Sequence, residues 1–308
     1  MRRLGLLALA FVLVPTALGA STRERQVAGP LSAVAVAASE VSYADEYATR
    51  CHEIRLWDVG TRADRRLATH CFASTSTGSG VAGVAATGGR ALWLTYTGGN
   101  IREWSLWTKG GAKAKRIQFL TADVDGPPPV VLGEVWEGSL PYAVGRTVIV
   151  LAPNGSRRFT FTAPDRVVAL SAHSRGYAAV LANGHVVTIS LQGRMLLDYP
   201  FEPGFVKDAV LAAPGLVMMT ANGIAVRRGG GVQEIPLPAN ARFLGYSEGI
   251  VAYGIGQQLR LVRLSGGHDV LFRTLAPGFQ AQLGRTGIAY TSGRTLGFRA
   301  WVFVSGAV

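Results

Sequence analysis

The two cysteines and the histidines next to them offer two kinds of chemistry. Cys51 and Cys71 bound a segment whose midpoint lies in a turn at residues 60–62. In a symmetric antiparallel hairpin the cysteines would face each other, with His52 opposite His70 on the other face. We favour a disulfide across an outer hairpin, which would add about 3 kcal/mol of stability in the chain-entropy model. The alternative, a Cys2His2 metal site, conflicts with strand alternation, because the histidines lie on the face opposite the cysteines.

We therefore expect a structural disulfide and no metal site. The two histidines are interpreted as a solvated cross-strand pair, and a two-histidine metal site is the less favoured alternative. The N-terminal segment described below predicts export, and an exported chain meets an oxidising compartment, which is consistent with a disulfide.

Several carboxylates and aromatic residues are candidates for contact with a ligand. Glycoside hydrolysis needs a pair of carboxylates, which a fold can assemble from segments far apart in the sequence. Three acidic residues near predicted inner strands fit this need by position, and two aromatic residues could line a sugar-binding rim. These ligand-facing candidates are Glu134, Trp136, Glu137, Tyr142 and Asp208.

Two further motifs are weaker. Ser247 lies in a Gly-x-Ser-x-Gly pattern, but a strand-like segment follows it where a nucleophile elbow needs a helix, so we interpret it as a turn. Asp123 and Asp125 resemble the start of a calcium loop that lacks its closing Glu, which favours a solvated loop. No phosphate-binding loop or dinucleotide fingerprint follows a predicted strand. We assign no catalytic, cofactor-binding or metal-binding residue.

The elements that must position these candidates recur along the chain. Apolar runs that end in small-residue turns begin near residues 34, 84, 132, 168, 210, 243 and 281. Their mean spacing, about 41 residues, is typical of four-stranded propeller blades. Hairpin signals such as Asn183-Gly184 and Asn222-Gly223 separate the strands within the repeats.

Seven such units predict an all-β fold, a seven-bladed β-propeller of four-stranded antiparallel blades, with six or eight blades as alternatives. The seventh unit contains three strands and ends near residues 301–304. We expect residues 25–31 to supply its outer strand and close the ring. The prolines at 127–129 indicate an inserted loop between the second and third units. Tryptophans on the predicted strands are expected to fill the space between blades.

The sequence resembles WD-repeat and TolB-like propellers in two features. One is the segment from Ile54 to Gly60, which contains Trp57-Asp58, and the other is the pattern of turns that divides each repeat into four strands. The resemblance covers about residues 25–305. It implies a propeller with an interaction surface and implies no particular reaction.

The first twenty residues have the layout of a secretory signal peptide. A positive start at Arg2-Arg3 is followed by an apolar run over 4–14 and then by small residues up to Ala20. The alternative is a membrane anchor, but a bilayer-spanning helix needs about 20 apolar residues. We expect cleavage after Gly19 or Ala20 and a single mature domain over 21–308.

Composition and charge limit the function classes. The chain has 308 residues, of which 48% are hydrophobic and 16% charged, and it contains 39 glycines. This composition excludes a disordered chain and disfavours a helical bundle. The net charge of +12 would attract an acidic protein, lipid head groups or an anionic polymer. Nucleic acid is not expected as a partner of an exported chain.

These observations predict an exported, non-catalytic, monomeric propeller. It would bind a protein or an anionic envelope polymer, and peripheral contact with a membrane or cell wall fits the same charge. Its location would be secreted, periplasmic or in the cell envelope. The alternative is a glycan-directed hydrolase or lyase with carboxylates on the rim or in the channel, and a third hypothesis is a structural envelope protein. Acidic and aromatic residues gathered in one concave site would favour the enzyme.

Overall fold

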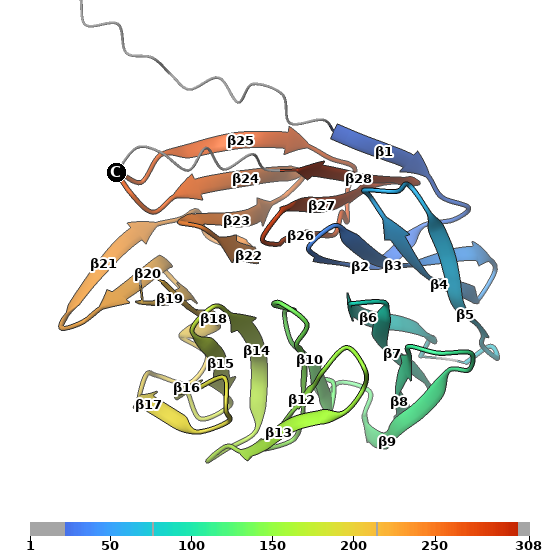
Figure 1. Cartoon of the computed structure of the whole chain (residues 1–308), viewed down its shortest axis with the longest axis horizontal. Coiled ribbons are helices and arrows are strands. Elements are labelled where there is room, and N and C mark those ends of the chain that lie inside the picture. Colours follow the sequence, from blue (N-terminus) through green and yellow to red (C-terminus); the bar gives the residue numbers. More distant parts are fainter. Residues whose placement is uncertain (1–21, 76, 214, 301–308) are drawn as a thin grey trace, which may run out of the picture.

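The computed structural model describes residues 22–75, 77–213 and 215–300. The regular structure of these residues consists of 28 strands in seven four-stranded antiparallel sheets, arranged around a central axis (Figure 1). The predicted all-β, seven-bladed propeller is therefore confirmed. No helix in the described ranges could cross a membrane.

The first four blades follow one another along the chain, each with its strands in sequence order from the axis outward. The first blade contains β2 (Leu31–Ala37), β3 (Glu40–Ala48), β4 (Cys51–Asp58) and β5 (Asp64–Cys71). The second contains β6 (Gly80–Thr87), β7 (Arg90–Gly98), β8 (Ile101–Lys109) and β9 (Lys115–Asp123). The third contains β10 (Val130–Leu132), β11 (Leu140–Val144), β12 (Thr147–Leu151) and β13 (Arg157–Thr162). The fourth contains β14 (Val167–His173), β15 (Gly176–Leu181), β16 (Val186–Ile189) and β17 (Met195–Tyr199).

The last three blades complete the ring. The fifth contains β18 (Val206–Ala212), β19 (Gly215–Thr220), β20 (Gly223–Arg228) and β21 (Gly231–Pro236). The sixth contains β22 (Arg242–Ser247), β23 (Ile250–Ile255), β24 (Gln258–Arg263) and β25 (Asp269–Thr274). The seventh contains β26 (Ala281–Leu283), β27 (Gly287–Ser292), β28 (Thr295–Ala300) and, as its outer strand, β1 (Thr22–Gln26).

The ring closes where the two ends of the chain share the seventh blade. β1 pairs with β28 in antiparallel register, from Thr22 opposite Arg299 to Gln26 opposite Thr295. The expected closing strand over 25–31 was therefore placed too late in the sequence, because Leu31 already begins β2. The third strand of this blade is β28, and the expected strand near 301–304 lies outside the described residues.

Packing between blades explains the burial pattern. Side chains of β15 and β16, the second and third strands of the fourth blade, are buried on both faces, whereas the outer strand β17 is largely exposed. Trp57, Trp93 and Trp104 are buried in clusters that join neighbouring blades, and Trp107 packs partly buried against one of them. This is the space-filling role expected for strand tryptophans.

In three blades a tyrosine of the second strand reaches the outer strand and donates its hydroxyl hydrogen to a carboxylate there. An arginine also donates to the same carboxylate. The three sets are Tyr43, Asp64 and Arg55; Tyr253, Asp269 and Arg260; and Tyr290, Glu24 and Arg273. Burial raises the pKa of all three tyrosines, so the hydroxyls remain donors. In the seventh blade, this contact ties β1 to the body of the sheet.

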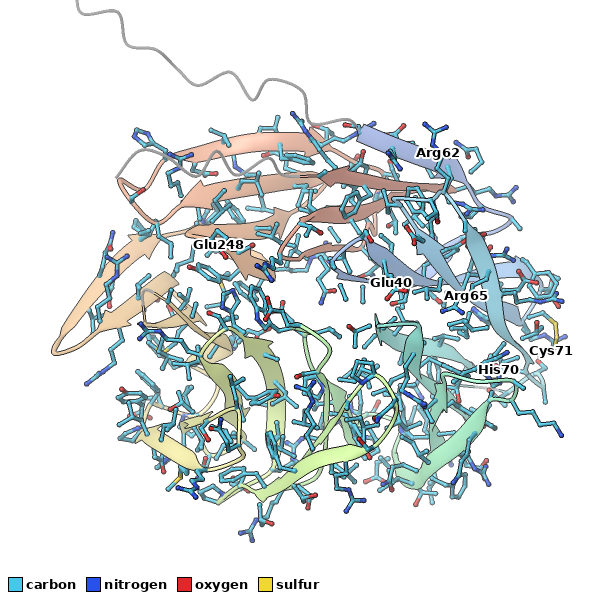
Figure 2. All side chains as sticks on the ribbon, in the orientation of Figure 1. Glu40, Arg62, Arg65, His70, Cys71 and Glu248 are labelled. Atoms are coloured by element: carbon cyan, nitrogen blue, oxygen red, sulfur yellow. A yellow bond between two sulfur atoms is a disulfide. The ribbon has the colours of Figure 1, made fainter. Side chains whose placement is uncertain are left out.

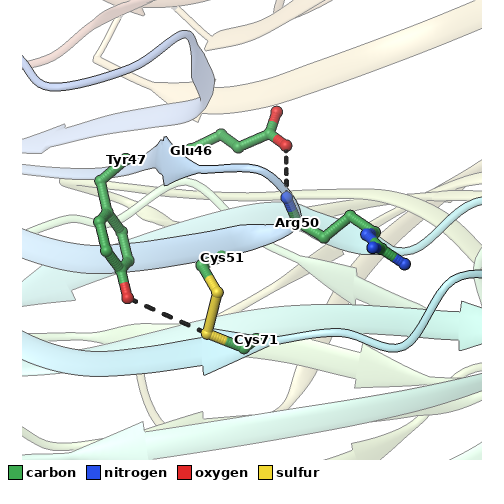
Figure 3. The surroundings of a disulfide bond; sticks show 5 residues. All are labelled: Glu46, Tyr47, Arg50, Cys51 and Cys71. Carbon is green, nitrogen blue, oxygen red and sulfur yellow. Dashed lines mark hydrogen bonds between the residues drawn. A yellow bond between two sulfur atoms is a disulfide. The ribbon is translucent and has the colours of Figure 1, made fainter.

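The disulfide lies at the outer edge of the first blade (Figures 2 and 3). Cys51 and Cys71 are directly opposed between β4 and β5, as predicted, and are bonded to each other. Tyr47 on β3 brings its hydroxyl to 3.9 Å from the Cys71 sulfur. The bond therefore joins the third and outer strands of the blade.

The histidine pair is paired across the strands as expected, but it is not solvated. His52 is only 6% exposed, and the Nε2 atom of His70 accepts a hydrogen bond of 2.8 Å from the indole N–H of Trp93 in the next blade. Burial lowers the pKa of both imidazoles. The second blade covers this face of the hairpin, which corrects the expectation of a solvated pair.

Candidate functional site

The inner strands of the blades surround a cavity of about 320 Å3 on the axis of the propeller. Its walls are mainly aliphatic, and three polar side chains face it from different blades. The aliphatic residues include Val34, Val84, Leu132, Leu170 and Leu244, and the polar residues are Glu134, Asp208 and Gln282. The structure thus brings two of the predicted carboxylates into one enclosed space.

The electrostatics of this pair follow from its enclosure. Both residues are half-buried in the wall of the cavity. Burial, and secondarily the nearby charge of Asp208, raises the pKa of Glu134 well above its ordinary range. Burial also raises the pKa of Asp208 to about 7, although the N–H of Ala209 donates to its Oδ1 at 2.8 Å and opposes the shift. One carboxyl of the pair can thus hold a proton near neutral pH.

An unusually long connection forms one mouth of this channel. Residues 133–139 join β10 to β11, whereas the first and second strands of the five other blades with a fully described connection are joined by two or three residues. The backbone N–H of Glu134 donates to the carbonyl of Leu170 at 3.1 Å. Ser139 anchors the other end, because its hydroxyl accepts hydrogen bonds from Arg158 and Tyr177. Both ends of the loop are therefore fixed.

Aromatic and charged side chains from four blades meet at this mouth. The Trp136 ring lies 3.8 Å from that of His173, and His173 lies 5.2 Å from Tyr246, both measured between ring centroids. The Arg285 guanidinium lies 5.6 Å from the centre of the Trp136 ring and forms an ion pair with Glu137. These contacts place a cation over an aromatic face and beside a carboxylate.

His173 is a buried polar residue at the mouth with an unsatisfied atom. It is 4% exposed, and its Nε2 has no hydrogen-bond partner within the described structure. Its Nδ1 lies 3.0 Å from the hydroxyl of Ser174. Burial lowers its pKa to about 4, so the imidazole is neutral at physiological pH and adds no positive charge to the site.

The five predicted ligand-facing residues occupy three different environments. Glu134 and Asp208 line the channel, and Trp136 and the exposed Glu137 lie at its mouth. Tyr142, in contrast, is 3% exposed and packs between the second and third blades. It does not line the channel or this mouth, which differs from the rim position expected for it.

Three contributors to the mouth were not identified from the sequence. His173 ends β14, Tyr246 is the penultimate residue of β22, and Arg285 follows β26. All three occupy corresponding places, at or next to the end of an inner strand. An alignment of the repeats on these strand ends would have found them.

The other motifs behave as turns and loops. Ser247 is the buried last residue of β22, so the predicted turn is formed by Glu248 and Gly249 and the strand β23 follows it in place of a helix. Asp123 and Asp125 are exposed at the start of the connection between the second and third blades, where the inserted loop was predicted. The described residues contain no group of three or more His, Cys, Asp or Glu side chains that could hold a metal ion.

A second hollow lies away from the axis, between β1 and the first blade. It has a volume of about 710 Å3 and is rich in arginine. Two of these arginines, Arg25 and Arg55, are paired with Asp64 at 2.7 and 2.8 Å. Arg62 is exposed in the turn after β4. We refer to this hollow, lined by Arg23, Arg25, Arg55, Arg62, Trp57 and Asp64 among others, as the arginine groove.

Comparison with known proteins supports the fold and leaves the family open. No protein-family model matches the chain, and no curated protein matches it in sequence. The crystal structure of Raptor from Chaetomium thermophilum is similar over 91% of this chain, with a TM-score of 0.53 and 13% identity. This chain spans only 28% of the Raptor chain. A computationally designed protein, Ika8, aligns over 90% of this chain and 98% of its own, with a TM-score of 0.48 and 13% identity.

Proposed function

We propose that the protein is an exported, non-catalytic propeller that binds a protein partner at the channel mouth formed by residues 133–139. The observation that carries this proposal is the long, anchored loop that departs from the short turns of the other blades. Function in propellers resides in such loops, which a rigid ring holds in place. The resemblance of Ile54–Gly60 to WD-repeat and TolB-like propellers also supports an interaction role.

The side chains at the mouth have the character of an interaction site. The half-buried Trp136 and the exposed Arg285 are of types enriched in protein interfaces, whereas Tyr246 is 4% exposed and packs beneath them. An anionic envelope polymer is the other partner expected from the charge, and the arginine groove is the place on the molecule that suits it. Binding there, rather than at the mouth, is an outcome that the experiment below distinguishes.

Export rests on the predicted signal peptide over residues 1–20, which lie outside the described residues. Expression of the full chain in an exporting host, followed by N-terminal sequencing of the product, tests it. We expect the mature chain to begin at Ala20 or Ser21. An intact Met1 in the fractionated product would contradict export by this route.

Site-specific photo-crosslinking tests the binding site. A photoreactive amino acid replaces Glu137 at the mouth or, as a matched control, Phe119, an exposed residue on the outer strand β9. A third variant carries it at Arg62 in the arginine groove. We expect one discrete protein adduct from position 137 and none from 119. If adducts, to polymer or to protein, form only from position 62 in the arginine groove, the proposal that the mouth is the binding site is wrong.

The glycan-directed hydrolase or lyase is kept as a second candidate because of one observation. Glu134 and Asp208 share the channel with raised pKa values, and an acid–base pair needs one protonated and one ionised carboxyl. Apart from these two carboxyls, Gln282 is the one polar side chain among the residues that line the cavity, so few side chains could bind a sugar, which is why binding is preferred. Hydrolysis of any member of a polysaccharide panel, abolished by Glu134→Gln, would reverse this preference.

A further inference from the structure

The carboxylates of the central channel lack a cationic partner. Within the described structure, Glu134 forms no side-chain hydrogen bond or ion pair, and Asp208 accepts only from the N–H of Ala209, at 2.8 Å. The chain carries 31 lysines and arginines, yet none is among the residues that line the cavity. A buried carboxylate without a partner is costly, so this pair is a place where a cation would be stabilised.

The walls of the channel favour an organic cation over a metal ion. Calcium takes six to eight oxygen ligands, whereas the side chains of the cavity offer two carboxylates and the Gln282 amide, whose oxygen already accepts from the Val36 N–H at 2.7 Å. The other side chains of the wall are apolar and include Val84 and Leu170. Such a wall suits the methylene stem of an alkylammonium group, whose charged head is stabilised by the polar groups of the cavity.

The mouth already accommodates a cation of this kind. The Arg285 guanidinium lies over the Trp136 ring, with the Glu137 carboxylate as its ion-pair partner. An aromatic face and a carboxylate are two features that recognise a guanidinium or alkylammonium ion, and at this mouth the Arg285 side chain occupies both. Neutral His173 stands at the same constriction and adds no repulsion.

The unsatisfied atom of His173 is a second, independent indication of a ligand. The ring is 4% exposed and lines the same constriction as Glu134 and Gln282. When Nδ1 donates to the Ser174 hydroxyl, the partnerless Nε2 is an acceptor. A buried acceptor without a donor costs free energy, and an N–H of an incoming ammonium group would satisfy it.

We propose that the channel is a binding site for an alkylammonium group, whose charged head lies at the Glu134 and Asp208 carboxylates. The group is a free amine or the side chain of a lysine presented by the partner. The inference rests on the proposed binding function at this mouth and adds the chemistry of the group that is bound.

Calorimetric titration of the purified protein tests the chemistry with defined probes. The probes are n-pentylamine, 1,5-diaminopentane, the neutral isostere 1-pentanol, the dianion glutarate and calcium chloride. We expect the amines to bind at least about tenfold more tightly than 1-pentanol, the effect of one charge-assisted hydrogen bond. Glutarate and calcium are expected not to compete with the amines for the site. A short peptide with one central lysine, compared with its norleucine analogue, separates a presented side chain from a free amine.

Variants assign the binding to the channel. Glu134→Gln combined with Asp208→Asn is expected to weaken amine binding at least about tenfold. The matched pair Glu202→Gln with Asp125→Asn removes two exposed carboxylates and is expected to leave binding unchanged. Melting curves check folding, and the channel variants are expected to be at least as stable as the parent because they remove buried charge.

Three results would overturn the proposal: no amine binding, equal binding of amine and alcohol, or amine binding that the channel variant retains. If any of these three results is found but the protein still crosslinks from position 137 in the channel variant, the mouth remains a binding site. Only the cation chemistry is then refuted. Amine binding without any adduct from position 137 would refute the protein partner and keep the channel site.

Discussion

The ionisation of Asp208 should make the stability of the protein depend on pH, and Asp208→Asn should remove the part of that dependence that Asp208 contributes. Burial raises the pKa of this carboxyl from 3.8 to about 7. Below about pH 4 the side chain is protonated in both the folded and the unfolded state. Between pH 4 and 7 the unfolded chain loses a proton that the folded chain retains, so the free energy of unfolding falls as pH rises.

The size of the effect follows from the shift. A change of about three units at about 1.4 kcal/mol each gives about 4 kcal/mol at pH 8. Water in the channel screens part of this, so we expect about 2 to 4 kcal/mol. At 2 to 4 °C per kcal/mol for a domain of this size, Asp208→Asn should raise the melting temperature by roughly 4 to 16 °C at pH 8.

Differential scanning calorimetry of the parent and the variant from pH 4 to pH 8 measures this directly. The gain should be close to zero at pH 4 and should grow through pH 5 to 7. Asp125→Asn, in the exposed loop before β10, is the matched control and should follow the parent at every pH. A gain at pH 4 as large as at pH 8, or no gain at either, would refute the buried-charge argument.

Three further substitutions test the packing of the ring, each by thermal unfolding. Tyr290→Phe removes the hydroxyl that donates to Glu24 at 2.8 Å and should cost about 1 kcal/mol, since Glu24 is partly solvated. Gly297→Ala would place a Cβ 2.2 Å from Cζ of the Tyr290 ring and should destabilise the fold by about 1 to 3 kcal/mol. Cys71→Ser opens the disulfide and should cost about 3 kcal/mol, and a reductant should have the same effect on the parent.

Each of these has a control and a contrary outcome. Tyr199 carries a hydroxyl without a hydrogen-bond partner in the described structure, so a loss for Tyr199→Phe equal to that for Tyr290→Phe would discount the contact with Glu24. Gly99 has open space around it, so Gly99→Ala is the control for Gly297→Ala. An equal loss of stability in both variants would discount the contact with the Tyr290 ring. For the disulfide, a reductant that lowers the stability of Cys71→Ser as much as that of the parent would show that reduction acts elsewhere.

The blades could be predicted because their signals are local. Turns such as Asn183-Gly184 mark each hairpin, and the symmetric spacing of Cys51 and Cys71 gave the correct strand register. The outer strand β1 was misplaced because its residues, 22–26, alternate only between exposed and half-buried. Such a strand has no apolar periodicity, and it forms because β28 offers it a free edge.

Only those residues of the site could be predicted whose place follows from their position within a repeat. Glu134 and Asp208 were identified because residues near inner strands face the axis. His52 was misjudged because alternation tells which face a side chain occupies and not that the second blade covers that face. The meeting of Trp136 with Arg285 depends on ring closure, which brings together residues 149 positions apart in sequence.

The closure of the seventh blade also sets an order of events during synthesis. The contact between Tyr290 and Glu24 spans 266 residues, whereas the other six blades are made of consecutive hairpins. These six blades can assemble as the chain emerges, but β1 must wait without a partner until β28 has been made. Its alternating polar residues, Thr22 to Gln26, keep the waiting segment soluble and protect it from pairing with the exposed edge of another molecule.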